Sequence, residues 1–187
     1  MTGSQMVRHW TRAGTAIIAV ACCAVLPSSA IGQPPPTLDA ETTHQLTVAA
    51  GTLLRNRSEA LIQKRHHEQD APSEIMGVLI SPSLERVQEQ AVHELGFRGR
   101  APVEGGPAFT GARTRLDGGR AVRTGDRITL EATEHTEVRY DTGKVTQSVR
   151  RRFEFTTRDE RITMVGERVL DPAAHPLNDL DGPSDGR

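Results

Sequence analysis

Two stretches in the first half of the chain repeat apolar residues at steps of three and four, the spacing of one face of an α-helix. The first stretch covers about 43–63, and its stripe is Leu46, Ala49, Ala50, Leu53, Leu54 and Leu61, with Arg57 in the same row. The second carries Leu84, Val87, Ala91 and Leu95 on one face, with Gln88 on the other. Suitable N-caps are Thr42-Thr43 for the first helix and Ser81 or Ser83 for the second. Gly96 is a suitable end for the second helix. We therefore predict two amphipathic helices.

From Phe109 onward the period changes to two, which is the alternation of a half-buried β-strand. The predicted strands cover about 109–117, 121–123, 127–140, 145–157 and 161–170, and turn residues such as Asp117-Gly-Gly119 separate them. Two helices followed by such a meander indicate an α+β domain. We predict two N-terminal helices packed on a curved antiparallel sheet of four to five strands, as in cystatin-like and nuclear-transport-factor-like cones.

The longest predicted strand places a carboxylate on its apolar face. Glu134 alternates with Ile128, Leu130, Ala132 and Val138, whereas His135 belongs to the wet face. If Thr142-Gly143 is the centre of the hairpin turn, the ladder places Glu134 opposite Arg151. A buried carboxylate needs such a partner, and arginine donates two parallel charge-assisted hydrogen bonds.

The next hairpin extends this cluster. A two-residue turn at Asp159-Glu160 places Phe155 opposite Met164 and Arg151 opposite Arg168. The predicted pocket residues are therefore Glu134, Arg151, Arg168 and Tyr140, which ends the same strand face. Two interpretations remain open: the pair fixes the strand register, or it forms the polar floor of a concave pocket.

The ends of the chain have other patterns. Arg8 and Arg12 precede the apolar run 16–26 and Pro27-Ser-Ser-Ala30, which together are typical of a signal peptide, 1–30, cleaved after Ala30. The run is about eleven residues, too short for the ~20 that cross a membrane. We expect no transmembrane segment, a Pro-rich spacer over 31–42, one domain over 43–170 and a flexible tail over 171–187.

Export predicts a secreted, extracytoplasmic protein, with one alternative. Ala19-Val-Ala-Cys22 loosely resembles a lipobox, so a lipid-anchored form through Cys22 remains open. Both cysteines, Cys22 and Cys23, lie inside the predicted signal, which leaves the mature chain without disulfides or thiol ligands.

Composition narrows the function further. The formal net charge is −1 and only two of the 23 basic residues are lysines, so no nucleic-acid partner is expected. His66-His67 has no third ligand at a matching spacing, and no serine or threonine has a visible His–Asp arrangement. We expect no metal, no cofactor and no catalytic constellation.

Four segments carry a resemblance to a known family. They are the first long strand with Glu134 and Tyr140, the second with Phe153 and Phe155, the stretch Arg158–Met164, and the helix with Leu53, Leu54, Arg57 and Leu61. Together they resemble the N-terminal, non-catalytic region of secreted actinobacterial amidase-domain proteins. The resemblance covers about 45–170. Arg151 replaces the family's His, Ile162 stands where its Trp would be, and we expect no catalytic cysteine–histidine domain.

The resemblance implies an exported, non-enzymatic accessory domain that binds a protein or cell-envelope partner. The alternative is a small-molecule-binding or isomerase-like enzyme of the same cone fold, with Glu134 as a base in an apolar pocket. The two differ in one respect. A catalytic glutamate needs room for a substrate beside it, whereas an arginine-paired carboxylate is held ionised. Arg151 therefore favours the binding module.

Overall fold

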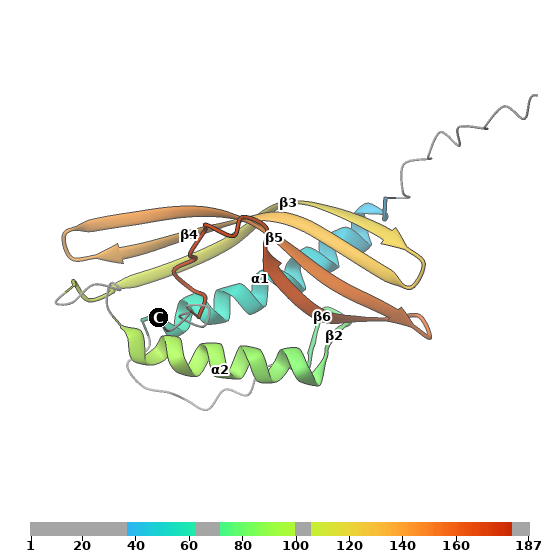
Figure 1. Cartoon of the computed structure of the whole chain (residues 1–187), viewed down its shortest axis with the longest axis horizontal. Helices are drawn as coiled ribbons and strands as arrows, with labels where there is room; N and C mark the ends of the chain where they lie inside the picture. Colours follow the sequence, from blue (N-terminus) through green and yellow to red (C-terminus); the bar gives the residue numbers. More distant parts are fainter. Residues whose placement is uncertain (1–36, 63–71, 100–105, 181–187) are drawn as a thin grey trace, which may run out of the picture. The chain divides into compact units, whose positions relative to one another are not determined.

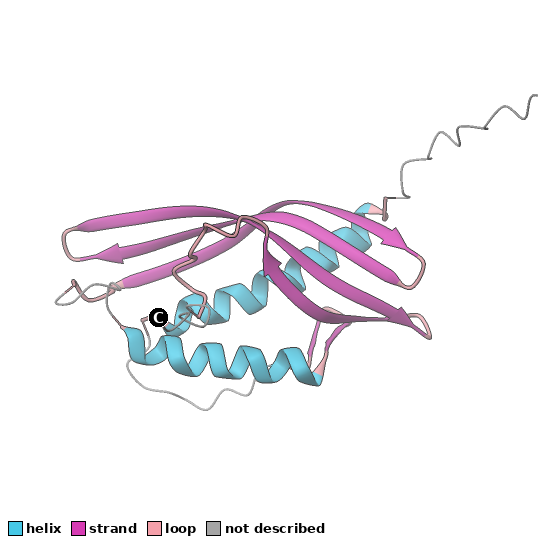
Figure 2. Cartoon of the chain, viewed as in Figure 1, coloured by secondary structure: helices cyan, strands magenta, loops and turns pink. Residues whose placement is uncertain are grey.

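The computed structural model describes residues 37–62, 72–99 and 106–180. In chain order they form α1 (Ala40–Ala60), β1 (Glu74–Ile75), β2 (Val78–Ile80), α2 (Pro82–Arg98), β3 (Gly111–Thr124), β4 (Arg127–Tyr140), β5 (Gly143–Arg158) and β6 (Arg161–Val169). Both helices lie against one face of a curved sheet, so the predicted α+β class is confirmed (Figures 1 and 2). The predicted signal peptide, its cleavage site at Ala30, Cys22 and the His66-His67 pair lie outside the described residues.

The helices form as their patterns predict, but their ends differ. Asp39, rather than Thr42-Thr43, caps α1, because its carboxylate accepts a hydrogen bond from Thr42 N at 2.7 Å. Ser81 caps α2, as predicted. Gly96 does not end α2, which continues to Arg98 and ends at Gly99 in the left-handed conformation that glycine adopts without steric cost.

The sheet has six strands, in the order β1-β2-β6-β5-β4-β3, rather than the four to five predicted. It is also mixed, because β2 pairs in parallel with β6. The additional strands come from the apolar patch at 75–80, which turns at Met76-Gly77, where both residues have positive φ. Strands of two and three residues are too short to show a period of two, so the sequence pattern did not reveal them.

Strand β3 is continuous where two strands were predicted. Asp117 pairs with Thr133 and Arg120 pairs with Glu131, so β3 has one extra residue at this point, a β-bulge. Gly118 adopts a φ of +61°, and a Cβ on Gly119 would lie 2.5 Å from a methyl carbon of Leu130. The two glycines thus permit a bulge rather than a turn between strands.

The core lies between the helices and the inner face of the sheet. The main cluster includes Leu46, Leu53, Leu54, Ile80, Leu84, Leu130, Phe153, Phe155 and Met164. Gly51 brings α1 close to β3, since a Cβ there would lie 3.6 Å from Leu116 Cβ. A second cluster contains Leu61, Leu95, Phe109 and Val138, with Tyr140 and Leu177 packed against it. The helices therefore occupy the concave face on which Glu134 lies.

Candidate functional site

Glu134 and Arg151 form a buried ion pair on the inner face of the sheet. Arg151 Nε donates to Glu134 Oε2 at 2.5 Å, and each side chain is 1% exposed. The predicted contact is present, but the predicted register is wrong by two residues. Glu134 pairs with Val149 and Arg151 with Ala132, so the two side chains meet diagonally along one face.

The register differs because the hairpin turn lies one position earlier than predicted. Tyr140 pairs with Gly143, which leaves Asp141 and Thr142 as the two turn residues. A shift of one residue in the turn moves the paired positions by two, which preserves the face of every side chain. Glu134 and Arg151 therefore remain on the same face and within reach of each other.

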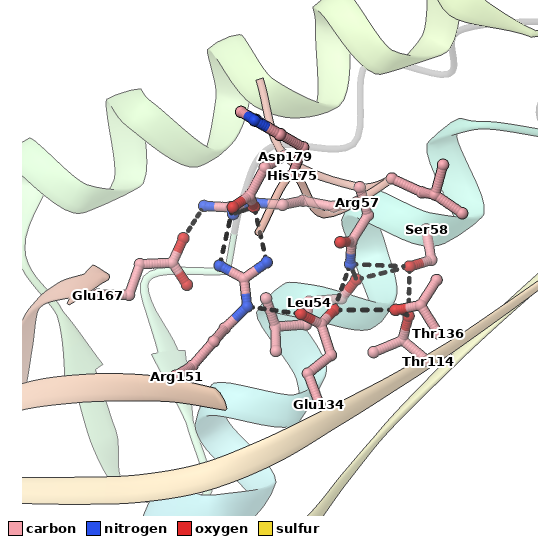
Figure 3. Close-up of polar contacts among 12 residues, drawn as sticks. Leu54, Arg57, Ser58, Thr114, Glu134, Thr136, Arg151, Glu167, His175 and Asp179 are labelled. Carbon is pink, nitrogen blue, oxygen red and sulfur yellow. Dashed lines mark hydrogen bonds and ion pairs between the residues drawn. The ribbon is translucent and has the colours of Figure 1, made fainter. Parts of the chain in front are cut away.

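A carboxylate from the C-terminal segment completes the site (Figure 3). Asp179 accepts two hydrogen bonds from Arg151, Nη1 to Oδ2 at 3.0 Å and Nη2 to Oδ1 at 2.9 Å. Arg57, from α1, donates through Nη1 to the same Asp179 Oδ1 at 2.8 Å. Arg151 is 28 positions and Arg57 is 122 positions from Asp179 along the chain, and both bind its carboxylate.

The second oxygen of Glu134 is also engaged. Asn178 Nδ2 donates to Glu134 Oε1 at 2.6 Å, and Thr136 Oγ1 donates to the same oxygen at 3.0 Å. A hydroxyl chain continues from Thr136 through Thr114 to Ser58, at 2.9 and 2.5 Å. Both oxygens of the Glu134 carboxylate therefore have hydrogen-bond donors from the protein itself.

Arg57 is held from three sides and is 4% exposed. Its Nε donates to Gln88 Oε1 at 2.8 Å, and its Nη2 forms an ion pair with Glu167 on β6. We predicted Gln88 on the polar face of α2, and this was wrong, because Gln88 is buried while Val87 is 51% exposed. The buried residues of α2 are at positions 84, 88, 91 and 95, and this spacing is also that of one helical face. The buried face of α2 therefore includes Gln88.

The cluster contains two arginines and three carboxylates, namely Glu134, Glu167 and Asp179. Burial by itself would lower the pKa of Arg151, but the charges of Glu134, Glu167 and Asp179 outweigh burial and raise the pKa above its ordinary value. Arg151 is therefore a permanent cation at any pH at which the protein is folded.

Two of the predicted pocket residues do not join this cluster. Arg168 pairs with Arg152 in the ladder and lies 3.9 Å from Glu154, on the exposed side. The cause is a bulge in β6 after the Phe155–Met164 pair, which was predicted correctly, so that Arg151 pairs with Val169. Tyr140 lies in the second apolar cluster, with its ring 5.6 Å from that of Phe109.

Within 37–62, 72–99 and 106–180, no group of three His, Cys, Asp or Glu side chains is arranged to hold a metal ion, and neither helix is long and apolar enough to cross a membrane. A half-open groove of about 380 Å³ lies beside the start of α1, between Leu38, Arg123, Arg158 and Ile162. None of its lining residues belongs to the polar cluster around Arg151.

Comparisons with known proteins give only distant likenesses. No family model matches the chain, and no curated protein matches it significantly. The intermembrane-space region of the chloroplast protein ARC6 is similar over 72% of this chain and 98% of its own, with 15% identity and a TM-score of 0.43. An NTF2-like protein involved in plasmid conjugation is similar over 68% of this chain and 50% of its own, with 9% identity and a TM-score of 0.28.

Proposed function

We propose that this chain is an exported, non-enzymatic accessory domain that binds a protein or cell-envelope partner. The observation that carries the proposal is the state of Glu134. Its two carboxylate oxygens accept hydrogen bonds from Arg151, Asn178 and Thr136, and the side chain is 1% exposed. A carboxylate whose two oxygens both accept from the protein, and which is almost fully buried, favours a structural role over a catalytic one.

The alternative, an isomerase-like enzyme, needs Glu134 at the floor of an open pocket. A general base must come within hydrogen-bond distance of the proton that it removes from a substrate. At Glu134 that place is taken by Asn178 Nδ2, 2.6 Å away, and by Thr136. The occupied site supports the binding module over the enzyme.

The edge of the sheet offers a surface for a partner. Strand β3 is fourteen residues long and is the last strand of the sheet. In the described part of the chain, the outer edge of β3 has backbone pairing only with Thr37 and Leu38, near Val122 and Ala121. A long edge strand has backbone groups free to pair with an added strand.

The charge of this edge favours an acidic partner. Four exposed arginines lie along β3: Arg113, Arg115, Arg120 and Arg123. Positive charge of this density increases the rate of encounter with an anionic protein or envelope polymer and makes binding salt-dependent.

The proposal also includes a fold family and a cellular location. Two helices on a curled sheet support a cone of the nuclear-transport-factor-like type, and the strand motifs support kinship with the accessory region of secreted amidase-domain proteins. The pattern over 1–30 supports an extracytoplasmic location, either free or lipid-anchored through Cys22. Sequencing the N-terminus of the mature protein from its native host distinguishes Ala30 cleavage from Cys22 acylation.

Site-specific photo-crosslinking of the full chain in its native host tests the partner surface. A crosslinking amino acid replaces Arg115 on β3, whose side chain is 67% exposed, or Arg158 at the β5–β6 turn, which is 94% exposed. We expect one discrete adduct from position 115 and none from the more exposed position 158. Equal labelling at both positions, or no adduct from β3, contradicts the proposal.

A further inference from the structure

Asp179 lies on two buried arginines as a carboxylate ligand lies in a binding site. Three guanidinium N–H groups converge on it, two from Arg151 and one from Arg57, at 2.8 to 3.0 Å. The arginines are 1% and 4% exposed, whereas Asp179 is 20% exposed. The receptor side of this contact is thus more deeply buried than the group that it binds.

The two arginines are held in place without Asp179. Glu134 accepts from Arg151 Nε, while Gln88 and Glu167 accept from Arg57 Nε and Nη2. These partners come from α2, β4 and β6, which are elements of the packed core. The donors that bind Asp179 are therefore oriented in advance, which lowers the entropic cost of binding a carboxylate.

The residue before Asp179, Asn178, is also bound by the groups around the arginines. Asn178 Nδ2 donates to Glu134 Oε1 and to Ser58 Oγ at 2.6 and 3.1 Å. Its carbonyl oxygen is buried without a hydrogen-bond partner in the described part of the chain. An unpaired acceptor weakens the hold of the segment, because its lost hydration is not replaced.

The segment that carries Asn178 and Asp179 is attached without sheet pairing. Residues 171–180 form neither helix nor strand. Besides Asn178 and Asp179, the attachment uses Gln147, which exchanges hydrogen bonds with His175 O and Leu177 N, and Arg98, which donates to Leu177 O and Asp179 O. Leu177 also packs against the second apolar cluster. Removal of this segment breaks no strand ladder of the sheet.

We propose that Arg57 and Arg151, with Glu134 and Ser58 beside them, form a binding site for an Asn-Asp peptide segment. In this structure the chain's own residues 178–179 occupy the site. The same site accepts an Asn-Asp segment supplied by another chain when the internal one is displaced. It is separate from the β3 edge, so the two proposals are independent.

The test uses the full chain with Asp179→Asn, which removes the internal carboxylate and leaves both arginines. The probe is a fluorescent peptide of residues 172–180, acetylated and amidated so that Asp179 is its only carboxylate. We expect saturable one-to-one binding by fluorescence anisotropy and a rise in the melting temperature of the variant. The matched peptide with Asn in place of Asp179 binds at least ten times more weakly.

Two further variants decide what the binding means. Arg151→Lys in the Asp179→Asn background removes the guanidinium group that donates two parallel hydrogen bonds. We expect this change to weaken the binding of the wild-type peptide at least tenfold. Arg158→Lys, at an exposed turn, leaves its affinity unchanged. Equal affinity for both peptides, or no saturable binding by a folded Asp179→Asn variant, overturns the proposal.

If the Asp179→Asn variant does not fold, a chain cleaved before the Asn-Asp segment provides a second test. A specific protease site replaces 172–175 in the full chain, and cleavage frees the Asn-Asp segment while Arg57 and Arg151 stay unchanged. We expect the labelled peptide to exchange into the cut protein with a rate set by release of the internal segment. No exchange under a large excess of peptide overturns the proposal.

A mixing experiment identifies the source of the segment. One chain carries Asp179→Asn and an intact site, and the other carries Arg151→Lys and an intact segment. A heterodimer in analytical ultracentrifugation assigns the segment to a second copy of this chain. Monomers that still bind the free peptide assign it to a different protein with an Asn-Asp motif. Monomers that do not bind the peptide contradict the proposal.

Discussion

Arg57 on α1 and Arg151 on β5 donate to the same oxygen, Asp179 Oδ1, at 2.8 and 2.9 Å. Two buried cations that converge on one point repel each other, and an anion between them offsets this repulsion. Asp179 is that anion, and each arginine has one further carboxylate of its own, Glu167 and Glu134 respectively. The helix layer, the sheet and the C-terminal segment are thereby joined through a single charged cluster.

Replacing Asp179 by Asn should destabilise the protein by about 1–3 kcal/mol, because the buried guanidinium groups lose a negative charge and one of the two oxygens that accept from them. Urea denaturation measures the change. The matched control is Asp171→Asn in the same segment, where an exposed carboxylate accepts a hydrogen bond from Ala173 N. It should change stability by less than about 0.5 kcal/mol. Equal costs for the two variants would mean that Asp179 contributes no more than a surface residue.

Replacing Glu134 by Gln should cost about 3–5 kcal/mol, since it leaves the Arg151 cation buried without its closest partner. Glu131→Gln is the matched control on the same strand. Its carboxylate binds Arg152 on the outer face and is 35% exposed. A solvated pair of this kind contributes less than about 1 kcal/mol. If denaturation midpoints fall equally for both, the buried cluster does not hold the fold.

Glu137, on the outer face of the sheet, should make the stability of the protein depend on pH. Hydrogen bonds from Lys144 and Arg139 lower the pKa of Glu137 from 4.5 to about 2. The folded state thus holds this proton less tightly than the unfolded chain, so the contribution to stability is complete above about pH 4.5 and is lost as the pH falls to 2. NMR titration of the Glu137 carboxyl should show a midpoint near 2 that rises in Lys144→Gln. An unchanged midpoint in that variant contradicts the assignment.

The bulge in β3 should be sensitive at one glycine in particular. A Cβ on Gly119 would lie 2.5 Å from Leu130 Cδ1 and 3.0 Å from Thr47 Oγ1, so Gly119→Ala should cost about 1–3 kcal/mol through overpacking. Gly143→Ala, where no atom lies within 4 Å, should change stability by less than about 0.5 kcal/mol in the same thermal denaturation. A neutral Gly119→Ala would contradict the close approach of β3 to β4 and α1.

The Glu134–Arg151 contact could be predicted from sequence because a period of two fixes the face of every residue on a strand. The register could not, since it depends on which residues the turn uses. The predicted centre, Thr142-Gly143, was displaced to Asp141-Thr142. Arg168 was misplaced for a similar reason, because a bulge in β6 has no periodic signal.

The rest of the cluster was only partly visible in the sequence. Arg57 and Gln88 both occupy positions of the apolar helical rows, and a charged or amide residue in such a row signals a buried polar partner. Asp179 had no such signal. It reaches Arg57 across 122 residues from a segment without periodicity, which we had expected to be a flexible tail. Its position depends on tertiary packing alone.

The central claim is that Glu134 is a structural partner of Arg151 and not a free base. A double-mutant cycle of Glu134→Gln and Arg151→Met, followed by urea denaturation, measures it most directly. We predict that each single substitution costs about 3–5 kcal/mol and that the double variant costs about 2–3 kcal/mol less than the sum of the two, and this difference is the coupling energy. Additive costs, with a coupling below about 0.5 kcal/mol, would contradict the claim and return Glu134 to the list of candidate catalytic groups.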